Sequence, residues 1–476
     1  MKTFLFYDIE TSGLNHAFDQ ILTFACIRTD PGLNEIDRQT ITIRLRKDIV
    51  PSPRAFLTHK LTYDELELGI SEYEAALKIH KILNTPGTIS LGYNSLGFDD
   101  EFLRFLFYRN LLDPYTHQYS NGCCRMDILP VTVIFKVFHP TSLRWPQIDG
   151  KPSLKLDLIS VENNFVTSGR AHEALNDVEA VIQLSKILFQ EKDIWKYSLD
   201  FFNKTRDELR INSIEKGINI QNMRFRVCLM MSASFGSKVN YMAPVIHLGQ
   251  SLAYKNQSLW LRLDSDDILG LDTGRNINDT YVIRKRPADA LIVLPALERF
   301  WDRLPGTLQQ VANSNIEKIR HHWEKFFEFN QYHREYKYAF IPDMDPDTAL
   351  YQEGFFSARE KKQSALFHQT PDHQKYEILK KIKSPRIKIL ASRILARNFG
   401  DKIDQTDQAD RIEYHSYLAR LSSSLEKDQI IGYKNDSKFN CKQGIQELKE
   451  VEQEFLNPNP EIKTMLHWIK EYIKEL

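Results

Sequence analysis

The chain has 476 residues, 42% of them hydrophobic, which is enough to form two or three cores of ordinary domain size and argues against a single compact fold. Its 63 basic and 63 acidic residues balance, so the net charge gives no sign of a nucleic-acid partner. Any such partner would have to be bound by local basic patches. No apolar run approaches the ~18 residues that span a bilayer, and the first residues lack signal-peptide character. We therefore expect a multidomain cytoplasmic protein with no membrane contact, whose five cysteines are reduced thiols.

The first part of the chain alternates strand-like with helix-like segments. Four segments are rich in the β-branched and aromatic residues typical of strands: 4–10, 22–28, 40–45 and 88–93. Three segments carry apolar residues at helical spacing: 71–83, 99–112 and 172–190. This alternation predicts an α/β domain with a mixed sheet over residues 1–192.

The texture of the sequence changes twice after this domain. Apolar runs become shorter and turn signals separate them over residues 193–347, which predicts a second, β-containing domain. From 348 to 476 the pattern is mainly helical, and Pro385 breaks one long basic stretch. We therefore expect three domains.

Two acids, Asp8 and Glu10, stand at the end of the first predicted strand. Side chains two residues apart in a strand point to the same face, so these carboxylates converge and repel each other unless a cation lies between them. Hard oxygen ligands favour Mg²⁺ or Mn²⁺ over zinc. The alternative is a pair of solvated acids at a strand end.

Further acids lie at two later helix starts. Asp99 opens the helix predicted over 99–112, and Asp177 follows His172 by five residues. That spacing turns a helical side chain by roughly 140°, so His172 and Asp177 share a site only if His172 lies on a loop or a frayed first turn. Such an arrangement suits a mobile base above a fixed metal ligand. The alternatives are an ordinary first-turn acid for Asp99 and an exposed histidine beside an unrelated acid.

In this order, Asp8, Glu10, Asp99, His172 and Asp177 resemble the DEDDh superfamily of 3′ to 5′ exonucleases, through the motifs DIETSGL, NSLGFD and HEALND. Other segments, spread over nearly the whole chain, are similar to bacterial exonuclease I: GYNSLGFDDEFLRFLFYRNLLDPY, PSLKLDLI, HEALNDVEAV, MSASFGSKVNYMAP, LYQEGFFS and LARNFG. The resemblance implies an RNase H-like exonuclease domain, an SH3-like middle domain and a helical C-terminal domain.

The resemblance also implies a reaction, the processive hydrolysis of single-stranded DNA from its 3′ end to 5′ mononucleotides, in DNA repair and recombination. Asp8, Glu10, Asp99 and Asp177 would hold two Mg²⁺ ions, for which Mn²⁺ can substitute. One ion would activate a water, and the other would stabilise the leaving 3′ oxygen. His172 would be the general base, because a histidine with a pKa near ~6.5 takes up a proton around neutral pH.

The same resemblance implies a set of substrate contacts, since proteins grip single strands with aromatic faces and cations. The set is Glu10, at the terminal 3′ hydroxyl, with Thr11, Arg104, Tyr115, Tyr119 and Lys155. Tyr119 stands where the family has a tryptophan, and Lys155 replaces a family arginine, which keeps the charge but loses the bidentate fork. Outside the resemblance, each is a packing aromatic or a solvated base.

The basic stretch over residues 375–397 holds eight basic residues and one acid. It is a solvated face over a core stripe, part of the DNA path, or a receiver for an acidic peptide. The family binds the acidic C-terminal tail of the single-strand DNA-binding protein, so the partners implied are this tail and single-stranded DNA, with the enzyme a monomer. Two other functions stay open: a 3′ exoribonuclease of the same superfamily, and a binding module that no longer cuts.

Overall fold

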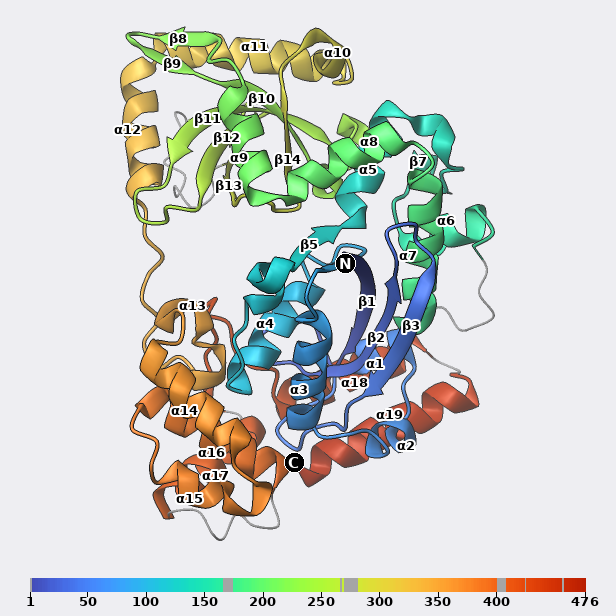
Figure 1. Cartoon of the computed structure of the whole chain (residues 1–476), viewed down its shortest axis with the longest axis vertical. Helices are drawn as coiled ribbons and strands as arrows, with labels where there is room; N and C mark the ends of the chain where they lie inside the picture. The colour runs from blue at the N-terminus through green and yellow to red at the C-terminus, as the bar shows by residue number, and fades with distance from the viewer. Residues whose placement is uncertain are drawn as a thin grey trace.

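The computed structural model describes residues 2–165, 174–265, 268, 281–399, 408–423, 425–455 and 458–476. Figure 1 shows an α/β region at its centre, a β-containing region above it and a helical region below, which confirms the expected classes of structure. Across these residues, no helix combines the length and the apolar character that crossing a bilayer requires. All five cysteines are free thiols.

The first sheet has the strand order β3-β2-β1-β4-β5. Its strands are β1 (Thr3–Thr11), β2 (Ile21–Thr29), β3 (Glu35–Thr42), β4 (Thr88–Gly92) and β5 (Cys124–Asp127). The first three pair antiparallel, whereas β4 runs parallel to both β1 and β5. The predicted mixed sheet is therefore confirmed.

One predicted strand is displaced. The sequence pattern placed it at 40–45, but β3 begins at Glu35 and ends at Thr42. Its first six residues are exposed because β3 is an edge strand, so they lack the apolar content that marks a strand in sequence. Ile43, which the pattern included, forms only an isolated bridge with Ile70.

Helices cover both faces of this sheet. On one face, α5 (Ile128–Phe138), α6 (Leu156–Glu162) and α7 (Ala174–Leu188) pack over Phe4 and Phe6 of β1. On the other face, α3 (Glu72–Leu83) and α4 (Asp99–Arg109) pack over Leu5, Tyr7 and Ile9. The period of two along β1 thus places Asp8 and Glu10 on the face that α7 covers.

The middle region is built on a second sheet, antiparallel throughout, in the order β13-β12-β11-β10-β14. This five-stranded arrangement is consistent with the expected SH3-like domain. Its strands are β10 (Val227–Met231), β11 (Met242–Gln250), β12 (Ser258–Arg262), β13 (Val282–Lys285) and β14 (Ile292–Pro295). The surrounding elements are α8 (Lys192–Leu199), α9 (Lys204–Ser213), β8 (Ile218–Ile220), β9 (Met223–Phe225), α10 (Glu298–Trp301), α11 (Gly306–His321) and α12 (Trp323–Glu335).

The rest of the chain is helical, as expected. Its helices are α13 (Leu350–Glu353), α14 (Ala358–Gln369), α15 (Lys375–Leu379), α16 (Pro385–Asn398), α17 (Gln408–Ser422), α18 (Cys441–Glu454) and α19 (Pro460–Glu475). Pro385 is the first residue of α16, which Ser384 caps. The last two helices return to the first region, where they share a core with α1 (Pro53–His59) and α2 (Tyr63–Glu67).

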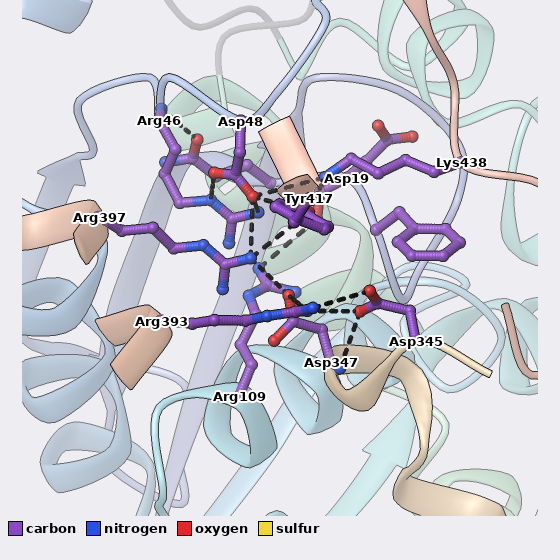
Figure 2. A network of polar contacts seen from close by, with 12 residues as sticks. Asp19, Arg46, Asp48, Arg109, Asp345, Asp347, Arg393, Arg397, Tyr417 and Lys438 are labelled. Atoms are coloured by element: carbon purple, nitrogen blue, oxygen red, sulfur yellow. Dashed lines mark hydrogen bonds and ion pairs between the residues drawn. The ribbon is translucent and has the colours of Figure 1, made fainter. Parts of the chain in front are cut away.

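A buried network of ion pairs joins the C-terminal helices to the first region (Figure 2). Arg397 lies 2.9 Å from Asp48, and Arg393 lies 2.7 Å from Asp345, with all four side chains at most 3% exposed. Lys375, also buried, donates to backbone oxygens. The view of residues 375–397 as one solvated basic face is therefore wrong for these three, because their charges are compensated inside the protein. Lys381 and Lys383 are exposed.

Candidate active site

Three carboxylates meet between β1 and α7. Asp8 and Glu10 project from the end of β1, and Asp177 lies in the first turn of α7, which packs on β1. One carboxylate oxygen from each lies within 4.8 Å of the others, and all three residues are half-buried. The alternative of two solvated acids at a strand end does not describe this arrangement.

Asp99 lies near this group, at the start of α4, the helix that packs on the other face of the sheet. It is the first residue of α4, it is 5% exposed, and the nearby backbone of Ile9 favours its anion. Ile9 lies between Asp8 and Glu10, so the start of α4 lies beside the part of β1 that carries them. Charge repulsion between Asp99 and Asp8 contributes to the pKa of Asp8, which also places the two groups close together.

Ionisation of the acids at this site is unfavourable without a cation, so their pKa values are raised. Burial, followed by repulsion from Asp177 and Asp99, raises the pKa of Glu10 to about 8. Burial also raises the pKa of Asp99 to about 8, and burial together with its three acidic neighbours raises the pKa of Asp8 well above its usual value. A divalent cation would relieve this repulsion, and oxygen-only ligands suit Mg²⁺ or Mn²⁺. The residues present therefore fit a divalent-metal site.

The turn after Glu10 is built by its own side chains. Thr11 donates from its hydroxyl to the carbonyl of Gly13 at 2.7 Å, and the N–H of Asn15 donates to Asp19 at 2.8 Å. A Cβ on Gly13 would lie 2.3 Å from Oδ2 of Asp19, so only glycine fits the turn as it stands. Thr11 is buried here, and its role as a substrate contact stays a prediction.

The structure brings two of the other predicted substrate contacts, Arg104 and Tyr115, together. The side chain of Arg104 is 4% exposed and pairs with Asp100 at 3.0 Å, one turn along α4 from Asp99. Its guanidinium lies 5.5 Å from the ring centre of Tyr115, which is half-buried. Tyr119 is 58% exposed, and Lys155 is exposed immediately before α6. His172 lies outside the described residues.

Two acids that sequence reasoning passed over support the start of α4. Asp127 accepts from the backbone N–H groups of Asn94 and Leu96, at 2.9 and 3.1 Å, and so fixes the loop between β4 and α4. Asp100 is fully buried; burial alone would raise its pKa, but Arg125 and Arg104 hold the pKa well below its usual value. The pair Asp99–Asp100 is visible in the sequence, but nothing there shows which of the two faces the site.

Comparison with known proteins adds family evidence to this geometry. The family model described as "Exonuclease" matches residues 5–185, and that described as "Exonuclease I C-terminal domain" matches residues 344–476. Exodeoxyribonuclease I of Buchnera aphidicola subsp. Acyrthosiphon pisum (strain APS) is 30% identical over 415 residues, which cover 83% of this chain and 97% of the relative.

Solved structures show the same fold. The metal-free crystal structure of the Escherichia coli exonuclease I complex with single-stranded DNA has a TM-score of 0.82 at 24% identity, and the alignment covers 100% of this chain and 99% of that one. The zinc-bound form of that complex has a TM-score of 0.81 at the same identity and coverage. Because the relative from Buchnera aphidicola matches nearly end to end and both family models match in order, the chain belongs to the exonuclease I family.

Proposed function

We propose that this protein is a Mg²⁺-dependent 3′ to 5′ exonuclease that removes 5′ mononucleotides processively from single-stranded DNA, in DNA repair and recombination. The observation that carries the proposal is the convergence of Asp8, Glu10 and Asp177 within 4.8 Å, with Asp99 close enough to repel Asp8. Family membership supports the reaction, and the single-stranded DNA bound to the Escherichia coli relative supports the substrate.

Each residue has a distinct part in the proposed reaction. Asp8, Glu10, Asp99 and Asp177 would hold two divalent ions, which when bound would supply charge to activate a water and to stabilise the leaving 3′ oxygen. Glu10 would also orient the terminal 3′ hydroxyl from the end of β1. His172 would take the proton of the attacking water, a role that rests on the resemblance to the superfamily. The partial burial of the carboxylates strengthens their electrostatic effect on the reacting groups.

Several parts of the proposal rest on the family alone. These are Mg²⁺ as the ion, with Mn²⁺ as a substitute, binding of the acidic tail of the single-strand DNA-binding protein, a monomeric state and a cytoplasmic location. We also propose Thr11, Arg104, Tyr115, Tyr119 and Lys155 as substrate contacts. The domain limits we propose are 1–192, 193–347 and 348–476.

Digestion of a 5′-labelled oligonucleotide, made as DNA and as RNA, tests the proposal with Mg²⁺ or with EDTA. We expect wild type to shorten only the DNA from its 3′ end, and only with Mg²⁺. Asp177→Asn should be inactive, whereas Asp193→Asn, which changes an exposed acid in the first turn of α8, should match wild type. Equal cutting of RNA would replace the DNA proposal by that of an exoribonuclease. Binding of both strands without cutting would indicate a binding module.

A further inference from the structure

The first turn of α4, which carries Asp99, is not held by an ordinary cap. Phe98 precedes the helix and makes no side-chain cap to its backbone N–H groups. Three backbone bonds at this point, from Asp100 to Ser95 and from Glu101 and Phe102 to Phe98, connect the helix to its own loop. These bonds stay within one loop and its helix, so the side chains of the next two residues, Asp100 and Glu101, attach the first turn to the rest of the protein.

Asp100 is held from within the exonuclease region. It accepts from Arg104 at 3.0 Å and pairs with Arg125 of β5, and the ring of His117 lies 3.4 Å away. The side chains of Asp100 and His117 are at most 1% exposed. This cluster fixes the buried side of the first turn.

Glu101 is held from outside that region. Tyr351, on α13 of the helical C-terminal region, donates its hydroxyl to Glu101 and lies 3.2 Å from a guanidinium nitrogen of Arg104, which also pairs with Glu101. The ring of Tyr351 packs on Phe105 and Tyr433, at 5.6 and 5.3 Å between ring centres. Figure 1 shows α13 beside α4. Tyr351 of the C-terminal region thus contacts α4 at Glu101, two positions after Asp99.

The far end of α4 is anchored separately. Arg109 donates to both carboxylate oxygens of Glu72, at 3.0 and 2.9 Å, and Glu72 in turn pairs with Arg46 at 2.8 Å. The network of Figure 2 continues from Arg46 to Asp48 and Arg397. Because this end is fixed, a change at Tyr351 should tilt the first turn rather than displace the whole helix.

We propose that Tyr351 is a positioning residue: through Glu101 and Arg104 it sets the direction of the Asp99 carboxylate, so that the C-terminal region takes part in divalent-cation binding. This inference rests on the proposed function, in which Asp99 is a metal ligand. Partners behind a metal ligand usually affect metal affinity strongly when they are removed. Tyr351 stands one step further from the metal than such a partner, so its effect should be smaller.

The test is Tyr351→Phe, which removes the hydroxyl but keeps the ring in its aromatic contacts. Tyr376→Phe is the matched control, because Tyr376 is a tyrosine of the C-terminal region whose ring also packs in the core shared with α4, but its hydroxyl donates to the carbonyl of Phe399 instead of to Glu101. The small substrate is the p-nitrophenyl ester of thymidine 5′-monophosphate, whose hydrolysis releases thymidine 5′-monophosphate and p-nitrophenol without a long DNA strand. Its rate is measured against Mg²⁺ concentration. Mn²⁺ affinity comes from electron paramagnetic resonance, and DNA affinity is measured in EDTA.

We expect Tyr351→Phe to raise the Mg²⁺ concentration for half-maximal rate, and the Kd for Mn²⁺, by about threefold to tenfold. DNA affinity in EDTA should fall less than metal affinity, because Arg104, a proposed DNA contact, keeps its pairs with Asp100 and Glu101. Tyr376→Phe should match wild type throughout. Glu101→Gln should have the same effect on metal affinity. The double variant should lose less affinity than the product of the two single losses, because both changes break the same Tyr351–Glu101 hydrogen bond. Thermal melting shows whether each variant is folded, and if Tyr351→Phe fails to fold, Glu101→Gln serves in its place.

Two results would overturn the inference. Wild-type dependence on Mg²⁺ and Mn²⁺ in folded Tyr351→Phe would show that Tyr351 does not position Asp99. Weaker DNA binding with normal hydrolysis of the small substrate would make Tyr351 a DNA contact instead. In both cases wild type still cuts DNA with Mg²⁺, so the proposed function stands, whereas a wild-type protein that cuts neither substrate would refute that function itself.

Discussion

Replacing Arg397 by methionine removes the central cation of the network in Figure 2 while keeping a long apolar side chain. Arg397 pairs with Asp48 and Asp347, and none of the three side chains is more than 4% exposed. Removing one partner of a buried pair typically costs ~3–5 kcal/mol. Asp48 keeps Arg46 at 2.9 Å and Asp347 keeps Arg393 at 3.1 Å, so we expect the lower end, about 3 kcal/mol at pH 7.

The loss should depend on pH. Burial alone would raise the pKa of Asp48 and of Asp347, but Arg397 and its neighbours hold both pKa values well below the usual range. A depressed carboxyl pKa contributes stability above the unfolded value of ~3.9, and this contribution disappears as the pH falls through the folded pKa. Without Arg397 the folded pKa values rise, so the difference between wild type and variant should be full at neutral pH and smaller below about pH 4.

Urea unfolding at pH 7 and at about pH 3 measures both effects. Arg54→Met is the matched control, because Arg54 of α1 also pairs across to the C-terminal helices, with Glu454 at 2.7 Å, but both side chains are about half exposed. An exposed pair contributes at most ~1 kcal/mol. A loss below about 1 kcal/mol for Arg397→Met, or equal losses for the two variants, would refute the argument that burial makes the Arg397 network important.

Three further predictions concern the site and its supports. The pKa of Glu10 and of Asp99 is raised to about 8, so the folded metal-free protein holds more protons than the unfolded chain between about pH 4 and pH 8. The melting temperature, measured by calorimetry, should therefore fall as the pH rises through this range. Bound Mg²⁺ should make this fall smaller. Gly13→Ala should lower kcat and cost about 1–3 kcal/mol in urea unfolding, because the new Cβ meets Asp19. Asp127→Asn should cost about 1–3 kcal/mol in the same assay, because its amide nitrogen would replace one of the two oxygens that accept from backbone N–H groups.

Each of these predictions has a clear contrary result. A melting temperature that stays constant between pH 5 and pH 8 without metal would show that the pKa values of Glu10 and Asp99 are not both raised. Gly306→Ala is the control for Gly13, because a Cβ at Gly306 meets nothing within 4 Å, and equal behaviour of the two variants would remove the steric argument. Wild-type stability of Asp127→Asn would show that the loop before α4 does not need this carboxylate.

Local patterns in the sequence predicted the parts of the site that depend on one element. The period of two in β1 was sufficient to place Asp8 and Glu10 together, and helical spacing indicated that α4 begins at Asp99. The same reasoning predicted the mixed sheet. The predicted position of edge strand β3 was wrong because most of its residues are exposed and give little apolar pattern to recognise.

Contacts between distant segments were not predictable from one sequence. Tyr351 and Glu101 are 250 positions apart, and no local pattern links them. Arg393 and Arg397 looked like solvated bases, because helical periodicity does not reveal that Asp48 and Asp345 lie opposite them. The roles of His172 and of the substrate contacts stay predictions that rest on the family.

The return of α18 and α19 to the first region has a consequence for the synthesis of the protein. Leu22 and Phe56 share one apolar core with Leu448 and Ile469, so the side chains that complete this core leave the ribosome only after the whole middle region has been made. We infer that the nascent exonuclease region stays incompletely packed until then, and that chains halted before α18 are cut by protease within α1. Newly made protein would thus gain its full rigidity only after α18 and α19 have left the ribosome.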